Sequence, residues 1–342
     1  MKIAIHKRNN SFSDRWIRYC EENSVSYKIV NCYDSDIIEQ LKDCAGLMWH
    51  WSHLDYKAQN FAKQLIKSIE KMEIKVFPSF DTSWHFDDKV GQKYLLESIN
   101  APLIPSYVFY DKISALNWIQ GTTFPKVFKL RGGAGSQNVK LIRNKKEAIK
   151  LAKQAFTKGF PLVNKNSDIK QKLWILKRDK DLKSVFGMFK GIGRFLFPRP
   201  NMGLLSVQKG YVYFQEFIPN NNFDDRIIVI GDRAIGLKRF VRKGDFRASG
   251  SGNFSYEKNS FDKKSIKLAF ETVKKLEAQS LAFDFIYNSN NEPLIVEISY
   301  CYSMGAAYDN CPGYWDSNLV WHEAPVNPQY WIIEDFIEEI RS

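Results

Sequence analysis

The sequence contains little that would anchor or cross-link it, and each absence excludes a class of protein. No apolar run in the 342 residues approaches the roughly 20 residues that span a bilayer. The N-terminal stretch MKIAIHKRNN lacks the apolar segment of a signal peptide. The five cysteines are odd in number and include no CxxC pair, which predicts reduced thiols without a disulfide framework or a zinc site. We therefore expect a cytoplasmic protein.

Acidic residues are outnumbered by basic ones. The chain has 50 Lys and Arg against 38 Asp and Glu, a net charge of +12, which favours anionic partners such as nucleotides, acidic sugars or a lipid surface. The sequence has no zinc knuckle, helix–turn–helix pattern or RNP-type aromatic motif, so we expect no nucleic acid partner. A non-catalytic polyanion-binding protein is kept as a remote alternative. The hydrophobic content of 44% predicts a packed core.

The first hundred residues alternate between strand and helix patterns. Short apolar runs occur at MKIAIH, SYKIVNC, AGLMWHW and KVFPS, and helical patterns at 14–22, 36–42 and 56–71 lie between them. This alternation predicts a parallel sheet with crossover helices, whose ligands would bind at the carboxyl ends of the strands. No G-x-G-x-x-G follows the first strand, so a dinucleotide site is not expected there.

Two aromatic segments lie at those strand ends, HWSHLD at 50–55 and FDTSWHFDDK at 80–89. They contain three of the five histidines, His50, His53 and His85. Such side chains either pack at a domain boundary or line a substrate pocket, and the sequence leaves both interpretations open.

A glycine-rich loop lies between two strand patterns in FPKVFKLRGGAGSQNVKLI, at 124–142. Lys129 ends the first strand, and Gly133, Gly135 and Ser136 belong to the loop. Glycine lets backbone N–H groups approach phosphate oxygens closely, while a lysine supplies a point charge. The loop lacks the GK[ST] ending of a Walker A motif. It is either a flexible turn or a phosphate-binding loop.

Residues 211–253 combine a strand, a hairpin and a group of cations. YVYFQEF predicts a strand that ends before Pro219, and DRIIVIGDRAIGLKRF predicts a hairpin that turns at Gly231 and Asp232. The cations that follow are Lys238, Arg239, Arg242, Lys243 and Arg247. They are arranged to bind an oxyanion, or they form a solvated basic edge strand.

A second hairpin carries two acidic residues. The apolar runs LAFDFIY and PLIVEIS, separated by NSNNE, predict two antiparallel strands. If Tyr287 pairs with Leu294, Asp284 lies opposite Glu297, with Cβ atoms roughly 5 Å apart. Two opposed carboxylates attract a cation, and Mg²⁺ prefers such oxygen ligands. The alternatives are a register slip that separates the two carboxylates, or an arginine paired with one of them.

In the order of these motifs, the chain resembles the ATP-grasp superfamily over about residues 85–300. The resemblance is to ligases of the ribosomal protein S6 modification type and the capsular polysaccharide biosynthesis type. It implies an α/β fold with α+β subdomains: an N-terminal parallel α/β domain at 1–87, a central lid domain at 88–217 and a C-terminal antiparallel sheet domain at 218–342. The C-terminal domain would carry the metal site.

The resemblance also implies how the nucleotide is bound. Lys89 and Lys129 match the two nucleotide lysines of the family, and Gly133, Gly135 and Ser136 match its phosphate loop. The hinge whose backbone reads adenine corresponds to QEFI, that is, Gln215, Glu216, Phe217 and Ile218. Asp224 and Arg226 match a D-x-R motif after the hinge, with Asp224 placed to meet the ribose.

The remaining matches concern phosphoryl transfer. Arg239 and Arg247 correspond to the arginines that face the γ-phosphate and the acyl phosphate, and Asp284 and Glu297 to the metal carboxylates. The family commonly ends this metal motif with Asn, and here Ser299 stands there. A hydroxyl is a poorer ligand for Mg²⁺ than an amide carbonyl, so a second ion would be held less firmly.

The activity implied by the resemblance is ligation of a carboxylate to an amine, with ATP and Mg²⁺ (or Mn²⁺) as cofactors. The suggested substrates are a uronic acid sugar of a bacterial surface polysaccharide and a small amino acid or amino alcohol. An ATP-grasp kinase that phosphorylates an alcohol is the alternative.

A basic insertion at 158–210 contains twelve Lys and Arg against three Asp. Its apolar residues recur at helical spacing, which predicts either contact of 170–197 with an anionic membrane or acidic glycan, or a solvated basic helix. Contact with the inner membrane face would make the protein peripheral.

The C-terminal tail predicts a terminal helix at 328–340, preceded by aromatic and polar residues that either line a pocket or close a hydrophobic gap: Tyr302, Asp309, Tyr314, Trp315 and His322.

Overall fold

The computed structural model describes residues 1–133, 138–161, 207–242 and 245–342. The chain forms two compact units. Unit 1 comprises Met1–Phe86, Gly91–Leu103 and Asn220–Ser342, and unit 2 comprises Asp87–Val90 and Ile104–Pro219. The three-part division expected from the sequence stays a prediction. Gly135, Ser136, Lys243 and the basic segment 170–197 lie outside the described residues.

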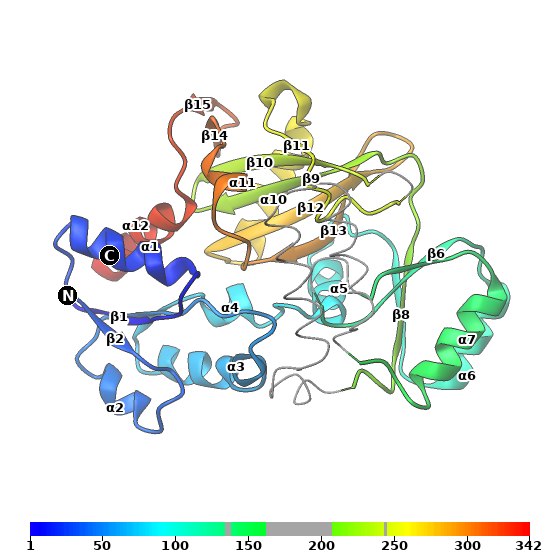
Figure 1. The fold of residues 1–342 in the computed structure, drawn as a ribbon, viewed down its shortest axis with the longest axis horizontal. Helices are drawn as coiled ribbons and strands as arrows, with labels where there is room; N and C mark the ends of the chain where they lie inside the picture. The colour runs from blue at the N-terminus through cyan, green and yellow to red at the C-terminus, as the bar shows by residue number, and fades with distance from the viewer. Residues whose placement is uncertain (134–137, 162–206, 243–244) are drawn as a thin grey trace, which may run out of the picture. The chain divides into compact units, whose positions relative to one another are not determined.

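Unit 1 begins with a parallel sheet, which confirms the prediction from the alternating pattern. The order is β2-β1-β3-β4, formed by β1 (Ile3–His6), β2 (Tyr27–Val30), β3 (Gly46–Met48) and β4 (Lys75–Phe77). Figure 1 shows α1 (Phe12–Glu22) and α12 (Pro328–Arg341) on one face of this sheet, and α2 (Ile37–Leu41) and α3 (Tyr56–Glu70) on the other. Helix α1 buries Phe12, Trp16 and Cys20, which recur every four residues and therefore share one face. The short helix α4 (Phe80–Ser83) follows β4.

An antiparallel sheet forms the rest of unit 1. Its strands follow the order β13-β12-β9-β10-β14-β15, and β11 pairs with β10. The strands are β9 (Phe223–Ile230), β10 (Arg233–Phe240), β11 (Phe254–Ser255), β12 (Ser280–Tyr287), β13 (Pro293–Ser299), β14 (Gly313–Asp316) and β15 (Trp321–Glu323). The connecting helices are η2 (Lys258–Ser260), α10 (Lys263–Lys275) and α11 (Ala306–Asp309). The predicted hairpin with its turn at Gly231 and Asp232 is β9–β10.

The β12–β13 hairpin has the predicted central pair but a different turn. Tyr287 pairs with Pro293 and not with Leu294, so the expected turn register is wrong by one residue. The loop closes more tightly because the Asn291 backbone adopts a φ of 58° and its N–H donates to the Asn288 carbonyl. A register shift between Asp284 and Phe285 then restores the pairing of Asp284 with Glu297. The shift leaves one extra residue in β13, as in a β-bulge.

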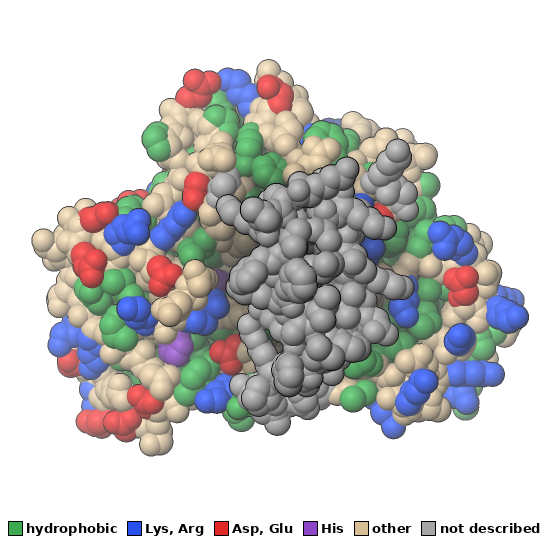
Figure 2. Space-filling model, in the orientation of Figure 1, with side chains coloured by type: hydrophobic (Ala, Val, Ile, Leu, Met, Phe, Trp, Pro, Cys, Tyr) green, Lys and Arg blue, Asp and Glu red, His purple; other side chains and the backbone are tan. Residues whose placement is uncertain are grey.

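Unit 2 contains a four-stranded antiparallel sheet with the order β5-β8-β6-β7. Its strands are β5 (Ser106–Phe109), β6 (Lys126–Lys129), β7 (Lys140–Ile142) and β8 (Val212–Glu216). Helices α6 (Lys112–Gly121) and α7 (Lys145–Ala155) share a core with β6 and β8. Lysine and arginine side chains gather over α6 and α7 on the face seen in Figure 2. Helix α5 (Lys89–Ser98) begins in unit 2 and continues in unit 1.

None of the helices in the described ranges is both long enough and apolar enough to span a membrane.

Candidate active site

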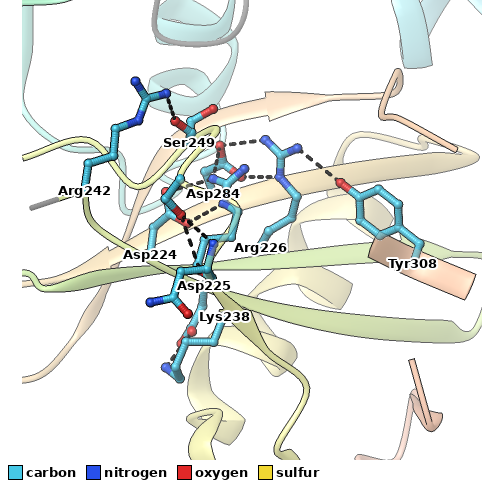
Figure 3. Close-up of polar contacts among 11 residues, drawn as sticks. Asp224, Asp225, Arg226, Lys238, Arg242, Ser249, Asp284 and Tyr308 are labelled. Carbon is cyan, nitrogen blue, oxygen red and sulfur yellow. Dashed lines mark hydrogen bonds and ion pairs between the residues drawn. The ribbon is translucent and has the colours of Figure 1, made fainter. Parts of the chain in front are cut away.

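Two carboxylates and two guanidinium groups alternate on one face of the antiparallel sheet in unit 1 (Figure 3). Arg226 donates from Nε and Nη2 to the two oxygens of Asp284, at 2.7 and 2.8 Å. Arg239 donates from the same two atoms to Asp224, at 2.6 and 2.8 Å. The Nη2 atom of Arg239 also lies 2.8 Å from Asp284 Oδ2. We call these four residues the charge quartet.

The charge quartet follows from the register of three adjacent strands. Asp284 of β12 lies opposite Arg226 of β9, and Arg239 of β10 lies opposite Asp224 of β9. Asp224 and Arg226 are two residues apart in one strand, so their side chains point to the same face. Opposite charges at directly opposed positions stabilise the pairing of neighbouring strands. Arg226 also donates from Nη1 to the hydroxyl of Tyr308, at 3.4 Å.

The charge quartet is largely shielded from solvent. The side chains of Arg239, Asp284, Asp224 and Arg226 are 10%, 13%, 14% and 23% exposed. Burial acts to raise the pKa of Asp284, but Arg226 and Arg239 outweigh it and hold this pKa well below its ordinary value. Burial, aided by the Asp284 charge, raises the pKa of Asp224 although Arg239 opposes the rise. Asp284 is therefore ionised at neutral pH, as a metal ligand must be.

Glu297 of β13 lies directly opposite Asp284, so the two predicted metal carboxylates occupy adjacent strands. Within the described ranges, no group of three His, Cys, Asp or Glu side chains is arranged to hold a metal ion. Mg²⁺ does not need such a group, because proteins bind it through one or two carboxylates while phosphates and water complete its shell. An ionised Asp284 beside Glu297 therefore fits Mg²⁺. The alternative of an arginine partner also applies, since Asp284 contacts two.

Ser299 uses its hydroxyl in a local turn after β13. The hydroxyl accepts from the backbone N–H of Cys301 at 3.1 Å and donates to the carbonyl of the same residue at 2.8 Å. The turn uses the proton and one lone pair of the hydroxyl, so a single lone pair of the oxygen remains for a metal ion. The role of Ser299 as a ligand stays a prediction.

Lys238 does not belong to the oxyanion cluster that the sequence predicted. Lys238 and Arg239 are neighbours in a strand and so point to opposite faces. Lys238 is 5% exposed and donates to Asp225 at 2.6 Å, which in turn accepts from the Tyr287 hydroxyl at 2.5 Å. Arg242 donates to the Ser249 carbonyl at 2.6 Å, as Figure 3 shows. The alternative of a solvated basic edge does not fit Lys238, Arg239 and Arg242, because all three are buried.

Arg247, expected at the acyl phosphate, forms an ion pair with a neighbour in sequence. Its Nε lies 2.9 and 3.0 Å from the two oxygens of Asp245, and its Nη2 lies 2.5 Å from Oδ2. The same carboxylate accepts from the backbone N–H groups of Phe246 and Arg247, at 2.8 and 3.2 Å. Asp245 thus holds the loop in which Arg247 lies.

In unit 2, the first residues of the glycine-rich loop contact the segment that contains Lys89. Lys89 Nζ donates to the Gly133 carbonyl at 2.9 Å, and its backbone N–H donates to the Arg131 carbonyl at 2.9 Å. The N–H of Gly133 donates to Asp87 at 2.7 Å, and Arg131 pairs with Asp88 at 3.0 Å. Lys89 and Gly133, two predicted nucleotide-binding residues, are therefore in direct contact. Sequence reasoning missed Asp87, Asp88 and Arg131, although the doubled acid before Lys89 was a visible signal.

The other predicted nucleotide residues of unit 2 lie on or beside the central strands of its sheet. Lys129 and Gln215 point away from the face that Phe128 and Phe214 share with α6 and α7, because side chains alternate along a strand. Gln215 donates to the Ser106 hydroxyl at 3.1 Å. Strand β8 ends at Glu216, whose carboxylate accepts from Lys126 at 2.8 Å and from the Tyr107 hydroxyl at 3.2 Å. Phe217 and Ile218 follow directly after the strand.

His50 and Trp51 of the first aromatic segment pack against other side chains of unit 1. His50 stacks on Phe12 with ring centroids 3.8 Å apart, and its Nδ1 accepts from the Phe12 backbone N–H at 3.2 Å. Its Nε2 therefore carries the proton and donates to the Cys301 sulfur at 3.1 Å. Burial, with the nearby Arg8 charge, holds the pKa of His50 well below its ordinary value. Trp51 packs on Tyr300, with centroids 5.1 Å apart. These contacts favour packing over a pocket for His50 and Trp51.

The residues of the tail that sequence reasoning offered as a pocket floor are also engaged within unit 1. Tyr302 lies 5.0 Å from the ring of Phe12, and Trp315 lies 5.4 Å from that of Phe261. Asp309 pairs with Arg15 at 2.6 Å. His322 stacks on Tyr314 at 5.0 Å and contacts Asp316 at 2.9 Å. The interpretation that these side chains close a hydrophobic gap fits Tyr302 and Trp315, which are buried.

Solved structures share this fold. D-cycloserine synthetase DcsG has a TM-score of 0.58 at 11% identity, over 99% of this chain and 100% of that protein. The D-alanine–D-alanine ligase of Bacillus anthracis, in complex with ATP, has a TM-score of 0.52 at 13% identity, over 89% and 87%. The biotin carboxylase domain of the Hydrogenobacter thermophilus 2-oxoglutarate carboxylase, in complex with MgADP, has a TM-score of 0.58 at 11% identity, over 97% and 68%. At these identities the likeness concerns the fold.

No curated protein matches the sequence. Residues 126–305, more than half of the chain, match the RimK-like ATP-grasp domain family. The match confirms the predicted ATP-grasp fold, and with it the class of ATP-grasp ligases, which use ATP. The chain therefore belongs to the RimK-like ATP-grasp family.

Proposed function

We propose that this chain is an ATP-dependent ligase that joins a carboxylate to an amine through an acyl phosphate. The observation that carries the proposal is the opposed pair Asp284 and Glu297, with Arg226 and Arg239 beside Asp284. A metal carboxylate next to two guanidinium groups suits transfer of a phosphoryl group, because both its metal ion and its equatorial oxygens need positive charge.

The reaction has two steps. The γ-phosphoryl group of ATP passes to an oxygen of the substrate carboxylate and ADP leaves. The amine then attacks the acyl carbon, and the amide forms as inorganic phosphate leaves. Mg²⁺, held by Asp284 and Glu297, would neutralise the phosphate charge during the first step. Arg239 would bind the transferring phosphoryl oxygens, and Arg247 would stabilise the acyl phosphate and the tetrahedral state that follows.

The residues that match the nucleotide-binding motifs of the family would bind the phosphates and the adenine of ATP. Lys89 and Lys129 would bind the α- and β-phosphates, together with the loop that contains Gly133, Gly135 and Ser136. The backbone of Gln215–Ile218 would read adenine, most directly at Phe217 and Ile218, since Gln215 and Glu216 lie within β8. Arg226 would act with Arg239 on phosphate oxygens. Ser299 would be a weak additional metal ligand.

For the substrates we propose a uronic acid sugar and a small amino acid or amino alcohol, as in synthesis of a bacterial surface polysaccharide. The excess of basic residues supports an acidic substrate. A kinase that phosphorylates an alcohol is the second candidate, because it would use the same nucleotide site. We also propose that 170–197 contacts an anionic membrane or an acidic glycan. Flotation of the chain with anionic liposomes tests the membrane contact.

A substrate screen tests the proposal. The full chain is incubated with ATP, Mg²⁺ and a panel of uronic acids and amino acids, and the products are read by mass spectrometry. An amide with the mass of both substrates less water, formed with ADP, supports ligation. A stable phosphate ester would favour the kinase, and the absence of any nucleotide turnover would favour a polyanion-binding protein.

Glu297→Gln tests the metal carboxylate. The variant keeps the size of the side chain and removes its charge, so we expect a loss of about 10²–10³ in turnover with an unchanged unfolding midpoint. ADP release is followed by a coupled assay and folding by circular dichroism. Release of ADP at the wild-type rate would show that Glu297 does not hold the metal.

A further inference from the structure

The structure gives Asp224 a partner that leaves little room for the role expected from the sequence. Both of its oxygens accept from Arg239, at 2.6 and 2.8 Å. The two residues are directly opposed in the β9–β10 ladder, and both side chains are at most 14% exposed. A two-point contact between a carboxylate and a guanidinium group fixes both the position and the plane of the arginine. A ribose hydroxyl would have to compete with that contact.

Arg239 has a second partner, Asp284, whose Oδ2 is 2.8 Å from Arg239 Nη2. The same oxygen accepts from Arg226 Nη2 at 2.8 Å, so both of its lone-pair positions are occupied. If a metal ion binds Asp284, it competes with the guanidinium groups for the carboxylate. The contact of Arg226 with Asp284 spans both oxygens, whereas that of Arg239 uses one atom. Arg239 is therefore bound to Asp284 less firmly than Arg226 is.

We propose that Asp224 is a positioning residue that keeps Arg239 in place when Asp284 binds the metal. This inference rests on the proposed function, since it takes Arg239 as the residue that binds the phosphoryl oxygens. Asp224 then acts through Arg239 and not on the ribose. Its two-point contact prevents the guanidinium group from following Asp284 toward the metal, so that the group stays directed at the γ-phosphate.

Nucleotide affinities separate the two roles of Asp224. The dissociation constants of Mg·ADP and of the Mg complex of the β,γ-imido analogue of ATP are measured by calorimetry on the full chain. The dissociation constant of Mg·ADP divided by that of the analogue complex reports the contribution of the γ-phosphate. We expect Asp224→Asn to lower this ratio about tenfold, as expected for loss of a hydrogen bond between charged groups, while the affinity for ADP stays the same.

Arg239→Met and the double variant complete a thermodynamic cycle. If Asp224 acts only through Arg239, Asp224→Asn causes no further loss of the γ-phosphate preference in the Arg239→Met background. If Arg239→Met does not fold, Arg239→Lys is used, because it keeps the charge but cannot form the two-point contact. An additional loss in this background would overturn the inference, as would an equal weakening of ADP and analogue by Asp224→Asn.

Asp225 provides a matched control on the same strand. It is fully buried and bound to Lys238 and Tyr287 on the opposite face of the sheet. We expect Asp225→Asn to lower the unfolding midpoint but to leave the γ-phosphate preference unchanged. Tyr287→Phe, which removes one hydrogen bond from Asp225, serves if that variant does not fold. If the wild-type chain binds neither nucleotide, the proposed function itself fails. A wild-type preference that survives in Asp224→Asn overturns this inference alone.

Discussion

At the scale of single residues, His85 is a buried polar group of unit 1. Its side chain is fully buried, and in the described part of the chain neither ring nitrogen has a hydrogen-bond partner. Burial, with the nearby charge of Lys63, lowers the pKa of His85 to about 4. An unsatisfied buried polar group costs about 1–3 kcal/mol of folding free energy. His85 therefore weakens the fold more than an apolar side chain of similar size would.

Replacing His85 should stabilise the protein, and most of all in acid. The unfolded state binds a proton below the ordinary histidine pKa of 6.5, whereas folded His85 binds one only near pH 4, so stability falls as the pH drops through this window. We expect His85→Leu to raise the free energy of unfolding by about 1 kcal/mol at pH 7. At pH 5 the gain should be larger by about 1–2 kcal/mol. Urea unfolding at both pH values measures these differences.

His85→Asn separates the two effects, because it keeps a polar group but does not titrate. The free energy of unfolding of this variant should no longer show the acid dependence contributed by His85. At pH 7 it should rise less than in His85→Leu. A His85→Leu protein less stable than the wild type at pH 7 would contradict the explanation. It would indicate that a buried water or ligand satisfies the ring.

At the scale of elements, the last helix lies close to the parallel sheet at Gly46. A Cβ atom added to this residue of β3 would lie 2.6 Å from the ring of Phe336 in α12. Helix α12 also reaches the antiparallel sheet, where Arg233 of β10 pairs with Asp335 and Glu334. The absence of a side chain at residue 46 thus allows one helix to join both sheets of unit 1.

Gly46→Val should loosen α12. Valine suits a strand, but its side chain would overlap Phe336, and overpacking of this kind costs about 1–3 kcal/mol. In this variant, amide hydrogen exchange along Pro328–Arg341 should be faster than in the wild type. The increase should be larger there than in β1 or β3. Gly121→Ala is the matched control, because nothing lies within 4 Å of an added Cβ there. Equal exchange rates in Gly46→Val and wild type would show that α12 is not held by this contact.

At the scale of the whole molecule, nucleotide and metal should stabilise the folded chain together. A ligand that binds only the folded state raises its stability by about 2.7 kcal/mol at a concentration 100 times its dissociation constant. We expect ATP with Mg²⁺ to raise the unfolding midpoint more than either does alone. The carboxylates of Asp284 and Glu297 and the phosphates are all anionic, so they interact favourably only through the metal ion. Addition of EDTA should remove most of the joint effect.

The Glu297→Gln variant is the control for this thermal-shift experiment. It should retain the shift that ATP causes alone and lose most of the additional shift caused by Mg²⁺. A midpoint that rises equally with ATP in the presence and absence of Mg²⁺ would contradict a metal site at these carboxylates.

Much of the fold followed from local patterns. The alternation of strands and helices in the first hundred residues predicted the parallel sheet, because each pattern specifies which face of an element is apolar. The pairing of Asp284 with Glu297 was also correct, although the turn register used to derive it was wrong by one residue and a bulge corrected it. The bulge could not be foreseen, since nothing in the apolar run marks the extra residue.

Most contacts of the candidate site were not predictable in this way. The grouping of Lys238 with Arg239 was wrong because adjacent residues of a strand point to opposite faces. The hydrogen bond from the Gly133 backbone N–H to Asp87 joins two segments 46 residues apart. Contacts of this kind depend on how separate segments fold together, which residue spacing does not reveal.

The sequence by itself located the strands of the parallel sheet and the β9–β10 and β12–β13 hairpins. Only the tertiary structure decided which strands are neighbours. Arg226 meets Asp284, 58 residues away, because β9 lies between β12 and β10 in the sheet. The physical reason is that side-chain alternation is a property of one strand, whereas the order of strands depends on the packing of the whole unit. That order placed two arginines beside the carboxylate expected to bind the metal.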